Sequence, residues 1–171
     1  IFPGSGNGVN TTTLTPEYQT TYRSSIQPAF QAYVSTPINN VTGDGTAYTI
    51  IFGSETFDQA SNFNTGTGVF TAPVAGRYFL GTTVQLVAIT AGMTVITVVI
   101  TTTGGNFQVA TGSGISRDAN NNMVFSGGVF VNMAAGDTAS VVITAFFGTK
   151  VADINGAASN STTTFFGHLV C

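Results

Sequence analysis

From Phe70 onward the chain repeats one pattern: a short run rich in Val, Ile, Thr and Phe, followed by a turn of Gly, Asn or Asp. Residues 93–102 are followed by Gly104-Gly105, and residues 123–133 by Gly136-Asp137. β-Branched and aromatic residues favour strands, whereas Gly, Asn and Asp favour turns. No run approaches the roughly 20 apolar residues that a membrane-spanning helix needs. The pattern therefore predicts an all-β domain without membrane insertion.

The spacing of these runs predicts roughly eight to ten short strands, which is typical of a β-sandwich or jelly roll. Within residues 123–133, Val129, Val131 and Met133 share one face because side chains alternate along a strand. Polar loops are expected over residues 112–122 and 148–161. The expected strands cover residues 29–35, 48–52, 76–87, 93–102, 107–110, 123–133, 139–147 and 162–170.

Formal charge is scarce: the 171 residues include four basic and seven acidic side chains, for a net charge of -3. The basic residues Arg23, Arg77, Arg117 and Lys150 lie far apart in the sequence. Nucleic acids and anionic membrane surfaces require clustered basic residues, so neither is an expected partner. Cys171 is the only cysteine, which excludes a disulfide within the chain. Stability must therefore come from a large core or from oligomerisation.

Residues 1–27 are expected to be a lead-in or stalk connection, and residues 28–171 a single globular head. Gly4, Gly6 and Gly8 alternate with other residues near the start, a spacing of two that excludes a collagen repeat. The first residue is Ile rather than Met, as expected for a processed product or a piece of a longer protein.

The sequence offers few candidates for chemistry. His168 is the only histidine, so one chain cannot form a Ser-His-Asp triad or a site with several histidines. A packed or edge histidine is the simpler interpretation, and three copies holding a metal or anion around a trimer axis is the alternative. Asp118, Asn120 and Asn122 resemble the start of a calcium loop, but Met123 and Val129 replace its usual Gly and Glu, which favours a turn. We therefore expect no enzymatic activity, no catalytic or metal-binding residues and no cofactor.

Six residues stand at the spacing of a known signature, and the string from Phe70 to Tyr78 matches its central segment closely. This pattern resembles the globular-head domain of the complement one-q family. Leu80 and Thr82 depart from it, because the family usually has aromatic residues there. The signature residues are Phe52, Asp58, Phe63, Phe70, Gly76 and Tyr78.

Other segments resemble the family in the same order along the chain: residues 28–32 its first strand, Gly136-Asp137 a late hairpin turn, and residues 164–167 its last strand. The likeness covers residues 28–170. It implies a ten-strand jelly-roll sandwich of the complement one-q and tumour necrosis factor type, assembling as a homotrimer. It also implies an extracellular or cell-surface location and a role in binding rather than catalysis. Asp58 is expected to bond to the backbone.

Two strands carry apolar side chains on both faces. Tyr78 and Leu80 are expected to point into the sandwich, which turns Phe79 outward. In the last strand, Phe166 and His168 share the face opposite Phe165. Since both faces are apolar, a neighbouring subunit is expected to cover one of them. A shift of one residue would exchange the faces, so the sequence leaves open which turns toward the threefold axis. Phe79, Phe166 and His168 are thus the trimer-interface candidates.

The function that these features favour is a trimeric recognition head at the C-terminal tip of a fibrous bacterial or viral surface protein. Such a head would mediate adhesion to a cell-surface glycan or protein, through loops expected over residues 104–122 and 148–161. Two alternatives stay open: a structural cap that trimerises a stalk or virion fibre, and a secreted cytokine-like ligand for a receptor. The ligand-binding residues themselves are not identified by the sequence.

Overall fold

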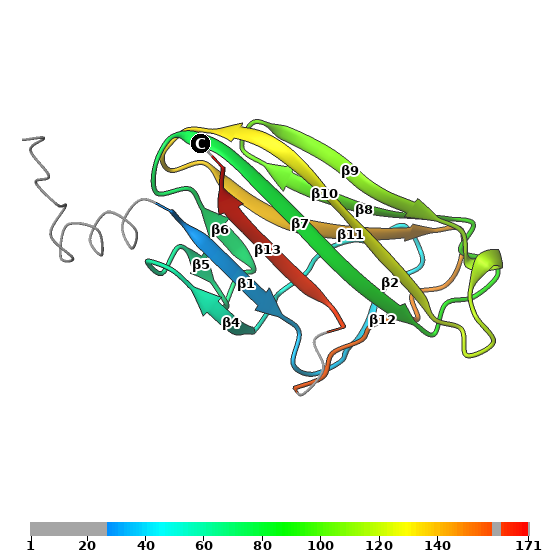
Figure 1. The fold of residues 1–171 in the computed structure, drawn as a ribbon. Coiled ribbons are helices and arrows are strands. Elements are labelled where there is room, and N and C mark those ends of the chain that lie inside the picture. Colours follow the sequence, from blue (N-terminus) through cyan, green and yellow to red (C-terminus); the bar gives the residue numbers. More distant parts are fainter. Residues whose placement is uncertain (1–26, 159–161, 171) are drawn as a thin grey trace, which may run out of the picture.

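The computed structural model describes residues 27–158 and 162–170, and within them it consists of two antiparallel β-sheets packed face to face (Figure 1). Nearly all of the expected lead-in, residues 1–26, lies outside the described residues, as does Cys171. The only helical element among the described residues is one 3-10 turn, Gly114–Ser116. The predicted all-β sandwich is confirmed.

The first sheet is built around its longest strand, β7, which pairs with β10 along one side and with β12 and β13 along the other. Beyond β13 the sheet continues through β1 to β4, and beyond β12 it ends at β2. Along one edge of β7 (Gly76–Val87) lie β12 (Ala152–Ile154), which pairs on to β2 (Ile38–Thr42), and β13 (Thr164–Leu169), which pairs on to β1 (Ala29–Tyr33) and β4 (Ser54–Asp58). Along the opposite edge of β7 lies β10 (Met123–Met133).

The second sheet is centred on β11, which pairs with β8 along most of its length and with two short strands on its other side. Its strands in spatial order are β5 (Phe63–Asn64), β6 (Val69–Thr71), β11 (Thr138–Phe146), β8 (Val95–Thr102) and β9 (Gly105–Gly112), with β3 (Ala47–Thr49) also paired to β11.

The strands with clear alternation have the predicted bounds, as β7 and β10 show, whereas short or polar strands do not. Residues 152–154 were expected in a polar loop, but they form β12, because Ala152 and Ile154 are buried and pair with β2. The run 48–52 is a strand only to Thr49, although Ile50 and Phe52 are fully buried. Strands of two or three residues, such as β5, raise the count above the ten expected.

The core between the sheets is aromatic. Phe30 stacks on Phe70 and Phe63, with ring centroids 4.6 and 5.0 Å away, and meets Phe165 edge-on at 5.0 Å. Tyr78 is fully buried as predicted, and its hydroxyl donates a hydrogen bond to the Val74 carbonyl at 2.8 Å. Burial raises the pKa of Tyr78, because the phenolate would lose its hydration.

Two acidic residues serve the backbone of this scaffold. A carboxylate oxygen of Asp58 accepts a hydrogen bond from the Phe63 amide at 2.9 Å, which confirms the expected backbone-bonding role. A carboxylate oxygen of Asp137 accepts from the Ala134 amide at 2.7 Å and so closes the turn at Gly136, whose φ is +89°. The late hairpin turn expected here is instead a connection between the two sheets, because β10 belongs to the first sheet and β11 to the second. Positive φ is available to glycine at little cost, so this turn suits the residue that occupies it.

Candidate subunit interface

The outer face of the first sheet carries a row of aromatic rings. On this face Phe79 of β7 is paired with Phe130 of β10 on one side and with His168 of β13 on the other. The ring centroid of Phe79 lies 5.0 Å from that of Phe130, 5.9 Å from that of His168 and 6.3 Å from that of Phe166. The structure therefore brings together the three residues that the sequence singles out, Phe79, Phe166 and His168.

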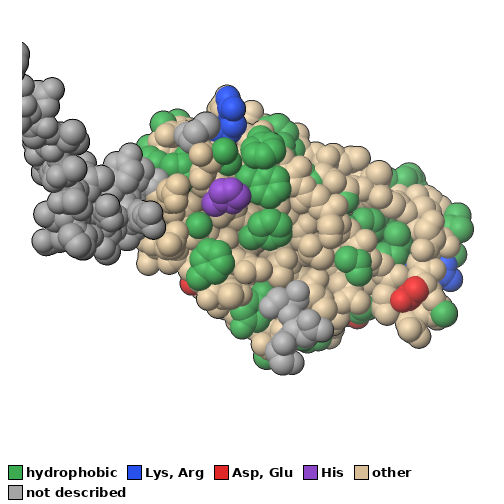
Figure 2. All heavy atoms as spheres, viewed as in Figure 1, with side chains coloured by type: hydrophobic (Ala, Val, Ile, Leu, Met, Phe, Trp, Pro, Cys, Tyr) green, Lys and Arg blue, Asp and Glu red, His purple; other side chains and the backbone are tan. Residues whose placement is uncertain are grey.

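Two further rings belong to this face, Phe130 and Phe57, which are 62% and 46% exposed. Figure 2 shows hydrophobic side chains gathered around the histidine, with few charged groups nearby. The alternation that turns Val129 and Val131 inward also turns Phe130 outward, so the exposed position of Phe130 could have been predicted from the sequence. Phe57 lies on β4, a strand that the sequence pattern does not predict. We refer to Phe57, Phe79, Phe130, Phe166 and His168 as the aromatic face.

Paired glycines let these rings lie close to the sheet. Gly81 is opposite Gly128 across β7 and β10. A Cβ atom at Gly81 would lie 2.6 Å from the ring of Phe166, and one at Gly128 would lie 2.8 Å from the ring of Phe79. Real Cβ atoms do not approach rings so closely, so a larger residue at either position would lift a ring off the sheet. The two glycines therefore allow the rings of Phe166 and Phe79 to lie close against the backbone of the sheet.

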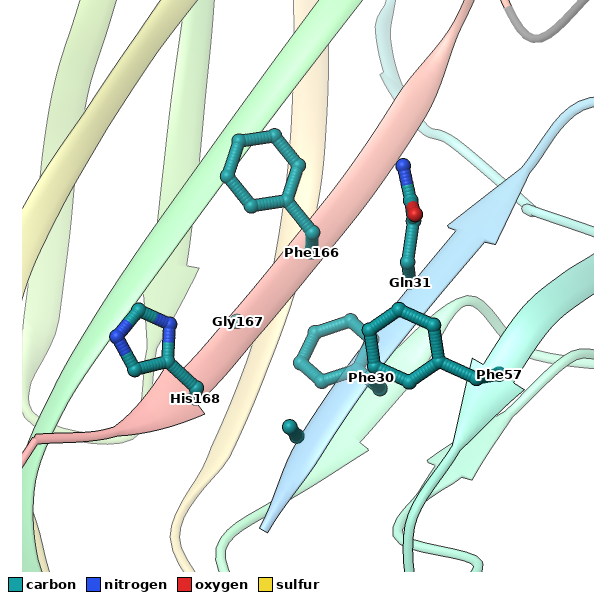
Figure 3. A pocket seen from close by; sticks show the side chains of 7 residues that line it. Phe30, Gln31, Phe57, Phe166, Gly167 and His168 are labelled. Atoms are coloured by element: carbon teal, nitrogen blue, oxygen red, sulfur yellow. The ribbon is translucent and has the colours of Figure 1, made fainter. Parts of the chain in front are cut away.

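Between β13 and β4 the aromatic face is hollowed into a groove of about 370 Å³ (Figure 3). Phe166 and His168 stand on one side of the groove and Phe57 on the other, with Gln31 of β1 between them. Among the described residues, none that lines the groove is Asp, Glu, Lys or Arg. The lining residues are Ala29, Phe30, Gln31, Phe57, Phe166, Gly167 and His168.

The described residues contain no group of three His, Cys, Asp or Glu side chains placed to hold a metal ion. The calcium-like sequence forms a turn, in which Asp118 Oδ1 accepts hydrogen bonds from the amides of Asn120 and Asn122 at 2.9 and 2.7 Å. Arg117 reinforces the turn, donating from Nε to Oδ1 of Asn121 at 2.7 Å. The carboxylate of Asp118 therefore organises its own loop.

A second surface lies at the end of the sandwich opposite the start of β1 and the end of β13 (Figure 1), where several loops meet. The Gly114 amide donates to the Met93 carbonyl at 2.7 Å, and the Gly148 amide donates to the Gly43 carbonyl at 2.9 Å. We call this surface, formed by residues 43–46, 88–94, 113–122 and 147–151, the loop end.

The loop end exposes Ile115 and Phe147, at 71% and 74%, and Phe147 has a φ of +70°. Positive φ costs a non-glycine residue about 1 kcal/mol or more, and such residues cluster at functional sites. The binding loops expected over residues 104–122 and 148–161 are shorter in the structure, because parts of both are strands. Residues 105–112 of the first loop form β9, since they pair with β8, and residues 152–154 of the second form β12. Only the parts around residues 113–122 and 148–151 reach the loop end.

The arrangement of the sheets is that of the jelly-roll domains shared by complement one-q and tumour necrosis factor proteins. The globular domain of zebrafish complement 1qA superposes with a TM-score of 0.57 at 17% identity, over 84% of this chain and 98% of that one. Murine APRIL at pH 5.0 superposes with a TM-score of 0.59 at 9% identity, over 84% of this chain and 99% of that one. These likenesses show the fold.

The family follows from the sequence itself, because the family model of the C1q domain matches residues 29–170. The chain therefore belongs to the C1q domain family. No curated protein matches it. Domains of this class are commonly trimeric, extracellular and ligand-binding, and they are generally recognition modules without enzymatic activity. In the part of the chain that the structure describes, no helix is both long and apolar enough to cross a membrane.

Proposed function

We propose that this chain is a non-enzymatic recognition head that works as a homotrimer, assembled through the aromatic face, and binds a cell-surface glycan or protein. The observation that supports it most is the aromatic face itself. One face of the first sheet is apolar and buried in the core, and the opposite, outer face carries the rings of the aromatic face. Among these, Phe130 is 62% exposed. Contiguous apolar surfaces of this kind mark interaction sites on soluble domains.

In this proposal the loop end carries the ligand. It lies at the far end of the sandwich from the start of β1, so a stalk joined through residues 1–27 would leave the loop end free. Its loops are joined to one another by backbone hydrogen bonds, and the Gly45 amide donates to the Ala145 carbonyl of β11 at 2.8 Å. Loops held in this way on a rigid scaffold commonly carry binding sites. Three copies multiply a weak single-site affinity by roughly 10²–10⁴ when the sites engage together. We assign the head to the tip of a fibrous surface protein on this basis.

The test is a binding comparison between the assembled protein and a monomeric variant. Fluorescently labelled protein is applied to a glycan panel and to intact cells, beside the Phe79→Glu variant. The proposal expects retention of the parent protein and at least a hundredfold weaker apparent affinity for the variant. Absence of binding to every surface, by a protein shown to be trimeric, would contradict the recognition role.

A structural cap is the second candidate, favoured by the position of the two ends of the head. The Leu169 amide donates to the Pro28 carbonyl at 2.9 Å, so the start of β1 lies beside the end of β13. A cap that nucleates a trimeric stalk needs its connection on one side in this way. Deleting residues 28–171 from a longer parent would then abolish trimerisation of the stalk, while the binding panel stays negative.

A further inference from the structure

Phe130 and the groove lie toward opposite sides of the same sheet. The strands run in the order β10, β7, β13, β1 and β4, with Phe130 on β10 and the groove between β13 and β4. Adjacent strands are about 4.8 Å apart, so three strand spacings, or about 14 Å, separate Phe130 from Gln31 in the groove. Phe130 therefore cannot fill the groove of its own chain.

The groove has the size and chemistry to take a phenyl ring. Its volume is about 370 Å³, whereas an apolar cavity of about 150 Å³ is enough to bind benzene. Phe57 and Phe166 provide aromatic walls, and the small residues Ala29 and Gly167 line the groove between them. Its lining, within residues 27–158 and 162–170, contains no carboxylate or ammonium group. A buried charged ligand would find no partner here, which favours an uncharged, aromatic occupant.

Symmetry indicates where that occupant comes from. An interface around a threefold axis is heterologous, so two different patches of the same chain meet. One side of the sheet offers a ring that is 62% exposed, and the other side offers an apolar groove. In a single chain the Phe130 ring and the groove both expose apolar surface to water, which is unfavourable. A threefold rotation that brings the ring of one subunit to the groove of the next buries both surfaces.

We infer that Phe130 of each subunit inserts into the groove of the next subunit, which makes the groove a binding site completed by a second copy of the chain. This inference rests on the proposed homotrimer. In each subunit Phe130 keeps its contact with Phe79, which is 5.0 Å away between ring centroids. Three such insertions close the ring of subunits, so Phe130 sets the direction in which each chain docks.

The direct test places a photoreactive benzoylphenylalanine at position 130 in the full chain. Light scattering first establishes the assembly state, then irradiation and mass spectrometry identify the cross-linked peptides. We expect bands of two and three linked chains, joined from position 130 to residues 29–31, 57 or 166–168. The same probe at Ser126, an exposed residue on the same strand, serves as the control and should give at least fivefold less of these products.

The outcomes separate this inference from the proposed function. A trimer that links position 130 to any other segment, residues 1–26 included, or that gives no links between chains, overturns the insertion and leaves the trimer intact. A monomer overturns both. A second variant pair supplies an independent readout: Phe130→Ala should raise the midpoint concentration for assembly at least tenfold, while Phe147→Ala should leave it unchanged. Equal midpoints for the two variants would count against the insertion.

Discussion

Replacing Phe79 with Glu is the perturbation that most sharply separates assembly from folding. Phe79 lies in the middle of the aromatic face, with Phe130, Phe166 and His168 all within 6.3 Å between ring centroids. Its side chain points away from the core, so in a free monomer the new carboxylate can stay hydrated. In the proposed trimer the same carboxylate is buried without a partner, once in each of three subunits.

The expected effect follows from the cost of an unpaired buried charge, which is about 3–5 kcal/mol. Three copies raise the free energy of the trimer by about 9–15 kcal/mol relative to monomers, and each 1.4 kcal/mol is a factor of ten. Because the midpoint concentration of a monomer–trimer equilibrium varies as the square root of its dissociation constant, we expect the midpoint to rise by roughly 10³- to 10⁵-fold.

The assay is sedimentation velocity over a wide concentration range, with circular dichroism to establish that the monomer keeps its β structure. The same substitution at Phe147 is the matched control, because that ring is 74% exposed at the loop end. Phe147→Glu should assemble like the parent protein. Unchanged assembly of Phe79→Glu, or equal loss in both variants, would refute the reasoning.

Three further predictions concern the scaffold. Gly81→Ala places a Cβ atom 2.6 Å from the Phe166 ring and should weaken assembly roughly tenfold by sedimentation, whereas Gly53→Ala, with nothing within 4 Å, should not. Asp58→Ala removes the carboxylate that binds the Phe63 amide and should lower the free energy of unfolding by about 1.5–3 kcal/mol in denaturant titration; an unchanged value would contradict the role assigned to it. The pKa of Tyr78 is raised in the folded state. The contribution of its protonated hydroxyl to the free energy of unfolding is therefore fully present below about pH 10 and is lost as pH rises through the folded pKa. Tyr78→Phe should remove this alkaline loss of stability, and equal pH slopes for parent and variant would argue against it.

Much of the fold could be predicted because the longest strands obey a simple alternation. In β7 the same period that buries Tyr78 and Leu80 turns Phe79 outward, and in β10 it buries Val131 and Met133. A strand that is apolar on both faces is expected to be covered on both, so the period identified the interface candidates, although it left open which face turns toward a neighbouring subunit. Only the pairing of β7 with β13 could show that these candidates meet, because it joins residues far apart in the chain.

The features that sequence reasoning missed are those set by tertiary contacts. β12 is three residues long and carries Asp153 at its centre, so neither length nor periodicity distinguishes it from a loop. It is a strand because β2 and β7 flank it. Phe57 joins the groove because the pairing of β4 with β1 places it opposite Gln31, next to a bulge where the register shifts between Gln31 and Ala32. Such a bulge changes which side chains share a face.

The measurement that tests the central claim most directly is the absolute mass of the protein in solution, by light scattering after size-exclusion chromatography. Assembly through the aromatic face predicts a homotrimer of about three times the 17.6 kDa chain. It also predicts that the Phe79→Glu variant elutes as a folded species of a single chain mass. A parent protein that stays monomeric at every accessible concentration, with the aromatic face left in water, would contradict the account.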